Sequence, residues 1–153
     1  MTFKEMENQL PRYASYITLI QLISNLKEAL PAYFDTSYLS DTFSIITATQ
    51  LTHALSFLNL INNDYSPSMR LKVLAPSSGA HHAALLRQVA EEAYPFVFKG
   101  LDIKKATYAE LQSIFLNTYH MEDVVCRRRV KFFIELSADA GIPLSLQLIH
   151  EFE

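Results

Sequence analysis

The sequence predicts a mainly α-helical fold made of two fused helix-turn-helix or winged-helix-like units that share a core, with at most short β-wings. Apolar residues recur at helical spacing in several segments. The 153-residue chain contains only three glycines, so few tight β-turns are expected. Its residues are 50% hydrophobic and 12% aromatic, which is enough to bury a sizeable interior. We expect an N-terminal arm over 1–15, a first unit over 16–76 and a second over 77–153, within one compact domain.

Apolar spacing predicts the first two helices. Residues 16–30 place leucines and isoleucines on one side of a helix, which Pro31 ends. A shorter helix is expected over about residues 37–43, with Asp35 or Thr36 as its N-cap.

A capping-box pattern at residues 47–50 predicts the start of the third helix, because Thr47 and Gln50 can each bond the other's backbone amide. This helix is expected to reach about Asn59. Its apolar face lies opposite a face of short, uncharged polar side chains, which includes Thr49, Thr52, His53 and Ser56.

A turn at residues 62–64 leads to Ser66-Pro67, which resembles an N-cap followed by proline at the first helical position. A short helix is therefore predicted over residues 69–74, with a β-wing strand as the alternative. The small and polar segment 75–82 is the predicted linker between the units.

Three helices are predicted in the second unit. Ser77 or Ser78 can cap a helix over about 80–94, which Pro95 ends. A second capping box, at residues 107–110, opens a helix to about Tyr119.

The last strong helix is expected over about 123–140, with Gly141 as its left-handed cap and Pro143 beyond it. Segments 54–68 and 132–145 follow the same order, in which an amphipathic helix leads to a turn containing proline and serine. This weak internal repeat also favours two related units.

The composition limits the class of protein. A net charge of −3 and a pI near 5.9 give no global positive field of the kind that strong nucleic-acid binders carry. Cys126 is the single cysteine, so no intramolecular disulfide can form. Residues 1–12 do not resemble a signal peptide, and the apolar run 16–26 is too short to span a bilayer. We expect a soluble, cytoplasmic protein without contact to membranes.

The sequence indicates no catalytic or metal site. Its histidines are scattered or adjacent, without ligand spacing, and are expected to be ordinary surface groups. Cys126 falls on the apolar side of its helix, which favours a buried thiol; exposure near the arginines would instead lower its pKa. The acidic pairs at 91–92 and 122–123 are expected to be helix-surface charge. The prediction is a non-enzymatic protein with no metal and no small-molecule cofactor.

Four segments, taken in order, resemble a prokaryotic family catalogued as a domain of unknown function, family number 5343. They are LPAYFDTSYLSDTFS, TATQLTHALSFLNLIN with SPSMRL, EEAYPFVFKGLDIKKATYAELQSIF, and RRRVKFFIELSADAGIPLS. The resemblance covers residues 16–146 and implies a small helical domain of tandem winged helices, with no known activity. The family's glycines before Pro67 are replaced here by Asn63, Asp64 and Tyr65.

The leading functional hypothesis is a DNA-binding or regulatory module. In a helix-turn-helix the second helix presents its exposed face to the major groove, and cations hold phosphates. Helix 48–59 would supply the base contacts, through Thr49, Gln50, Thr52, His53 and Ser56. The phosphate contacts would come from Lys104, Lys105, Arg127, Arg128 and Lys131.

Other interpretations remain open. The arginines can belong to a solvated helix face, on which Lys131 pairs with Glu135. Phe132 lies near that polar face, so a partner or another part of the chain is expected to cover it. The alternative function is a protein-interaction or dimerisation module without nucleic-acid binding. A third class, an effector that inhibits a host enzyme, is also open.

Overall fold

The computed structural model describes residues 14–153, and this part of the chain is mainly α-helical, as predicted. It contains nine helices and one isolated antiparallel β-bridge, between Ile61 and Pro67. The described residues divide into two compact units, 14–85 and 86–153. The division falls inside helix α6 (Gly79–Ala93) and not at 76–77, because the predicted linker is only a tight turn in which the Ser77 amide donates to the Leu74 carbonyl.

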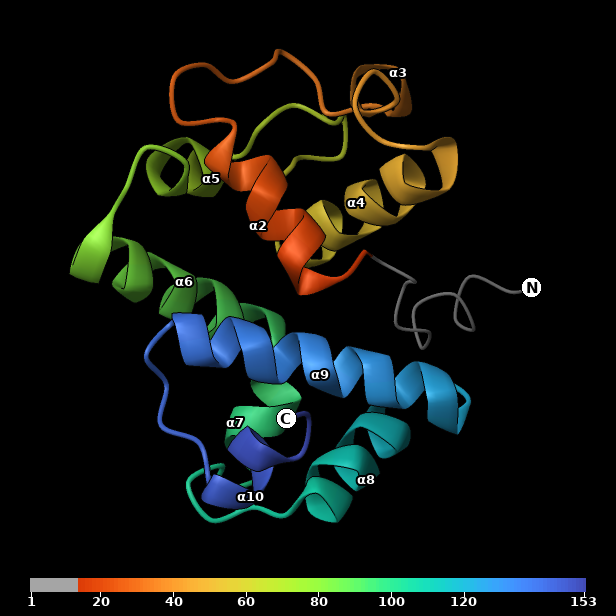
Figure 1. The fold of residues 1–153 in the computed structure, drawn as a ribbon, viewed down its shortest axis with the longest axis vertical. Coiled ribbons are helices and arrows are strands. Elements are labelled where there is room, and N and C mark those ends of the chain that lie inside the picture. The colour runs from red at the N-terminus through yellow and green to blue at the C-terminus, as the bar shows by residue number, and fades with distance from the viewer. Residues whose placement is uncertain (1–13) are drawn as a thin grey trace. The chain divides into compact units, whose positions relative to one another are not determined.

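The first unit is built around helix α4. It comprises α2 (Tyr16–Ser24), α3 (Thr36–Leu39), α4 (Ile45–Phe57), α5 (Met69–Leu74) and the start of α6 (Figure 1). Both α2 and α3 pack on α4. Their contacts bury a mainly aliphatic core that includes Leu19, Leu22, Phe34, Leu39, Leu51, Leu55, Leu71 and Leu74.

An extended segment between α2 and α3 is tied to the chain that returns after α4. The Phe34 amide donates to the Tyr65 carbonyl at 2.7 Å, and the bridge between Ile61 and Pro67 closes the turn that carries Tyr65. Asp64 holds this turn by accepting from the amide of Ser66 at 3.0 Å and from its hydroxyl. In the described part of the first unit, therefore, a few backbone bonds join the segments around Phe34, Ile61 and Pro67, where a long β-wing was the alternative.

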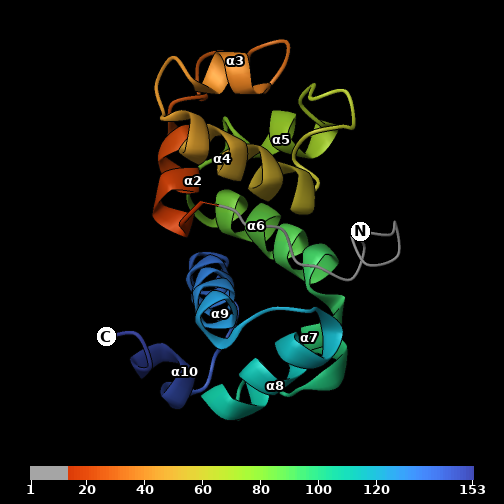
Figure 2. The same ribbon diagram turned by 90° about the vertical axis from the view of Figure 1, so that its right-hand side faces the viewer.

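The second unit has an aromatic core. It comprises the rest of α6 with α7 (Pro95–Gly100), α8 (Tyr108–Thr118), α9 (Asp123–Asp139) and α10 (Leu146–His150), shown from a second side in Figure 2. Tyr94 and Phe133 meet edge to face with ring centroids 4.8 Å apart, and Phe115 lies 6.0 Å from each of these rings. All three side chains are fully buried, so this cluster fixes how the helices of the unit pack.

The second unit repeats the pairing of the first. The segment between α7 and α8 is tied to the chain after α9, because the Ser145 amide donates to the Ile103 carbonyl at 2.8 Å. The Ser145 hydroxyl donates to the Ala106 carbonyl at 2.6 Å. In both units a non-helical segment and two helices precede a return segment that bonds the non-helical one.

Two predicted helix ends in the second unit are confirmed. Thr107 and Glu110 form the reciprocal capping box at the start of α8. Gly141 has a φ of +71° after α9, and the amide of Ile142 donates to the Ser137 carbonyl. This pattern is a Schellman motif, which requires the left-handed conformation that glycine adopts without strain.

Helix boundaries in the first unit differ from prediction. Helix α2 ends at Ser24 instead of near Leu30, with Asn25 as its C-cap. Helix α3 ends at Leu39 and takes Asp35 as its N-cap. Helix α5 is capped by Ser68 and not by Ser66, because Pro67 is held in the bridge to Ile61.

The predicted capping box at Thr47 does not form, because α4 begins three residues earlier. The Ser44 hydroxyl caps this helix by accepting from the Thr47 amide at 3.2 Å. Two short helices were not predicted. Pro95 stands at the first position of α7 and opens it, and Ser145 caps α10.

Replacing Ser44 by alanine removes the acceptor for the Thr47 amide. We expect Ser44→Ala to lower the free energy of unfolding by about 1 kcal/mol, measured by urea denaturation followed by circular dichroism. Gln50→Ala is the control, and it should change the stability by less than about 0.5 kcal/mol because Gln50 lies inside the helix. Equal losses in the two variants would contradict a helix start at Ser44.

Candidate interaction surfaces

The face of α4 that was predicted to read DNA is exposed only in part. Thr49, His53 and Ser56 are exposed, and Gln50 is half-buried. Thr52 is buried, and its hydroxyl donates to the Ala48 carbonyl at 3.0 Å. This local bond satisfies the polar group inside the helix and removes Thr52 from the predicted surface.

Two isoleucines dominate the start of α4. Ile45 is 68% exposed and Ile46 is 70% exposed. Helix α3 lies beside this end of α4 in both views (Figures 1 and 2). The N-terminal turn of α4, which would approach the bases in a helix-turn-helix, therefore presents apolar side chains.

Arg127, one of the predicted phosphate ligands, is engaged within the second unit. Its guanidinium donates to the Glu151 carboxylate at 3.0 Å and to the Glu151 carbonyl at 3.5 Å. It also lies over the rings of Phe152 and Tyr108, with centroid distances of 4.5 and 5.1 Å. The hydrogen bond that Arg127 donates to Glu151 raises the Arg127 pKa above its ordinary value. Arg127 therefore holds the C-terminal residues against α8 and α9.

The other predicted phosphate ligands are exposed. Arg128 and Lys131 lie three residues apart on α9, and Lys104 and Lys105 lie in the loop before α8. Among the described residues, neither Lys131 nor Glu135 forms an ion pair, so the salt bridge expected between them is not observed. Arg129 and Phe132 are buried, which confirms that another part of the chain covers Phe132.

A surface that the sequence analysis missed carries three exposed tyrosines on backbone segments that lie next to the buried Phe34. The bond from the Phe34 amide to the Tyr65 carbonyl places the segments that carry Tyr33 and Tyr65 side by side. The Tyr38 ring packs edge-on against Phe34 at 5.7 Å. Tyr33, Tyr38 and Tyr65 are 53%, 39% and 46% exposed, and we call them the tyrosine surface.

Acidic residues accompany the tyrosine surface. Asp35 caps α3 by accepting from the Tyr38 amide at 2.9 Å, Asp41 follows α3, and Asp64 precedes Tyr65. Hydrogen bonds from the hydroxyl and amide of Ser66 lower the pKa of Asp64, so this carboxylate is charged at neutral pH. The sequence contains neither lysine nor arginine between Glu28 and Met69, which was the available signal for an acidic surface.

Cys126 is fully buried and lies 3.8 Å from the Gln112 carbonyl. Burial, with a contribution from the charge of Asp123, raises the pKa of its thiol to about 11. The thiol is therefore protonated at neutral pH and is not an activated nucleophile.

The side chains of Ser77 and His82 form a hydroxyl–imidazole pair, and this pair also has a structural explanation. The Ser77 hydroxyl donates to the Leu74 carbonyl and lies 2.8 Å from Nδ1 of His82, within a hollow of about 200 Å³ that Lys27 also lines. Because the serine proton is committed to a backbone carbonyl, this pair ties the turn before α6 to the helix. His82 is accordingly half-buried and is not an ordinary surface group.

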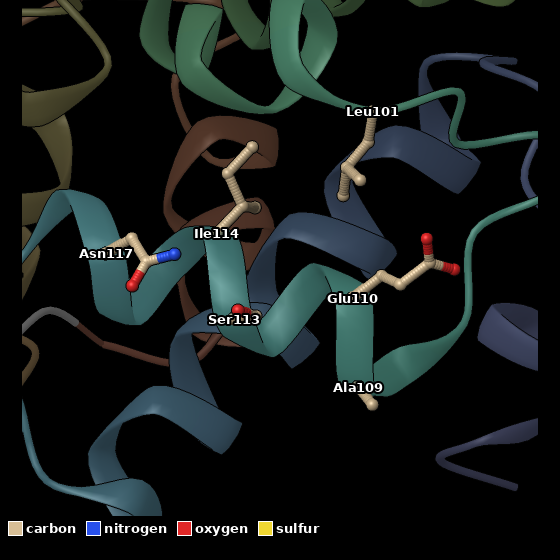
Figure 3. Close-up of a pocket in the computed structure, with 6 residues that line it drawn as sticks. All are labelled: Leu101, Ala109, Glu110, Ser113, Ile114 and Asn117. Carbon is tan, nitrogen blue, oxygen red and sulfur yellow. The ribbon is translucent and has the colours of Figure 1, made fainter.

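A larger hollow of about 440 Å³ lies along α8. Figure 3 shows Glu110, Ser113 and Asn117 projecting from α8, with Leu101 approaching from the preceding loop. Glu110 is already committed to the capping box, so the hollow contains no group poised for chemistry.

Residues 14–153 hold no group of three or more histidine, cysteine, aspartate or glutamate side chains that could bind a metal ion. None of the helices in this range combines the length and the apolar character needed to cross a bilayer. Comparison of the chain with known proteins found no matching family model, no similar curated protein and no similar solved structure. The resemblance drawn from the four sequence segments therefore stays a prediction.

Replacing Arg127 by alanine removes both the ion pair and the two ring contacts. Backbone amides of α10 should exchange with deuterium several-fold faster in Arg127→Ala, because the C-terminal residues lose their anchor. Arg128→Ala is the matched control on the neighbouring residue and should leave that exchange unchanged. A similar acceleration in both variants would show that Arg127 does not anchor the C-terminal segment.

The raised pKa of Cys126 can be tested by alkylation. At pH 8 the native protein should react with iodoacetamide more than about tenfold more slowly than the urea-unfolded chain, because both burial and protonation suppress the thiolate. Mass spectrometry of quenched samples measures the two rates. Comparable rates would overturn the assignment of a buried, neutral thiol.

Proposed function

We propose that this chain is a non-enzymatic protein-interaction module, in which two winged-helix-like units serve as a scaffold and the first unit binds the partner. The main support for this proposal is the distribution of exposed apolar side chains. The first unit holds eight of the eleven large ones among the described residues: Ile17, Tyr33, Tyr38, Ile45, Ile46, Tyr65, Met69 and Val73. Tyrosine and methionine, which supply four of these eight side chains, are enriched at protein interfaces.

The charges of the first unit support this choice over DNA binding by α4. The stretch from Glu28 to Met69 contains four acidic residues and no lysine or arginine, so its net charge repels phosphate. The exposed isoleucines at the start of α4 would meet the polar edges of bases without forming hydrogen bonds. Both features fit a protein partner.

The exposed cations of the second unit favour nucleic-acid binding as a second candidate. Arg128 and Lys131 project from α9, the long helix of the second unit. Lys104 and Lys105 lie in the loop before α8. Against this candidate, Arg127 is committed to Glu151. The second unit also holds more acidic than basic residues over 86–153, ten against eight.

Capture from the source cells tests the protein-interaction proposal. Purified wild-type protein and Ile45→Ser/Ile46→Ser are immobilised side by side, with Val124→Ser as the matched control in the second unit. We expect a protein retained by wild type and by the control but depleted with the double variant. Equal retention by all three proteins, or no retained protein, would contradict a partner surface on the first unit.

A gel shift with mixed duplex DNA tests the second candidate. Wild type should not bind at about 50 mM salt if the first proposal is correct. Binding at that salt that is lost in Arg128→Glu/Lys131→Glu, variants that leave Arg127 intact, would instead establish nucleic-acid contact by the second unit.

A further inference from the structure

We propose that the tyrosine surface of the first unit, Tyr33, Tyr38 and Tyr65, binds a peptide segment rich in arginine and lysine. This inference rests on the proposed function, because it names the chemical class of the partner. It is carried by three exposed tyrosines, which the Phe34–Tyr65 backbone bond and the Phe34–Tyr38 ring contact tie to one part of the first unit, and by the aspartates of the same segments.

The geometry of the surface is fixed by bonds within the first unit. Phe34 is fully buried and supports Tyr38 through an edge-on ring contact, while its amide holds the turn that carries Tyr65. The rings are thus presented by a pre-organised backbone, which reduces the entropy lost on binding. Tyrosine also supplies a large contact area with few rotatable bonds, which is why it is enriched at binding surfaces.

The chemistry of the surface favours a cationic ligand. The face of an aromatic ring attracts a guanidinium or ammonium group. Asp35, Asp41 and Asp64 add long-range attraction to the same ligand. The chain's own basic residues nearest in sequence, Lys27 and Arg70, lie outside the segment that builds the surface.

The alternative occupants fit less well. A symmetric pairing of two copies through this surface would bring the three aspartates of one copy against those of the other. A nucleic acid or an anionic membrane would be repelled by the same carboxylates. A basic peptide is the one class for which both the rings and the charges are favourable.

Fluorescence anisotropy with the full chain tests the proposal. The probe is a labelled synthetic peptide of alternating arginine and serine, with a glutamate-for-arginine version and a labelled DNA duplex as comparisons. We expect micromolar binding of the arginine peptide alone, weakened about tenfold between low and moderate salt. Preference for the glutamate peptide or for DNA, or no binding of the arginine peptide, would overturn the proposal.

Variants locate the binding. Tyr33→Ala/Tyr65→Asn should weaken the arginine peptide about tenfold; asparagine is chosen because Tyr65 has a φ of +69°. Asp41→Asn, which replaces an exposed carboxylate, should weaken it by a smaller factor. Tyr33→Phe keeps the ring and Val124→Ala lies in the second unit, so both should bind as wild type does. Unchanged affinity in the tyrosine and aspartate variants would overturn the assignment of the site.

The outcomes separate the two proposals. If cell capture still depends on Ile45 and Ile46 while the arginine peptide does not bind, the first unit binds proteins but the partner is not basic. If both experiments fail, the protein-interaction proposal itself is wrong. Should the double tyrosine variant unfold, as judged by circular dichroism, Asp41→Asn and the salt dependence still decide the question.

Discussion

The hydrogen bond from the Phe34 amide to the Tyr65 carbonyl is the contact on which the first unit depends. It joins an extended segment between two helices to a turn that follows the third, and the buried ring of Phe34 fills the space beneath them. A backbone bond over a buried ring is shielded from water, so its loss would expose both a polar pair and an apolar side chain. The second unit uses the bond from Ser145 to Ile103 for the same purpose. The arrangement of helices in each unit is therefore held by a return segment, in place of a full sheet.

Local sequence patterns predicted the helices well where both partners of a pattern lie close in sequence. The capping box of Thr107 and Glu110 and the glycine after α9 are of this kind. The similar pattern at Thr47 misled, because Ser44 lies one turn earlier and can cap the same helix. At this helix start the sequence allows two caps, and packing decides between them. Pro95 ends α6 as predicted, and it also opens α7, because proline is suited to the first position of a helix.

The candidate surfaces were harder to predict, because exposure depends on tertiary contacts. A helical projection placed Thr52 outside and Arg129 at the margin, yet both are buried. Arg127 was assigned to the solvent-facing side, which is correct, but its partners come from the C-terminal residues and from α8. The tyrosine surface combines residues from three separate segments, and no periodicity within one segment could reveal it. The position of a charged residue within its own helix is thus a poor guide to whether that charge is available for binding.

The turn tip at Tyr65 separates the demands of folding from those of binding. A bulky side chain at a φ of +69° costs about 1 kcal/mol relative to glycine, and asparagine also tolerates this conformation better. A library randomised at position 65 and selected only for thermal resistance should therefore drift toward glycine and asparagine. Selection for partner binding should return aromatic residues at the expense of stability. The residue found at position 65 would then show whether selection for stability or selection for binding has dominated at this surface.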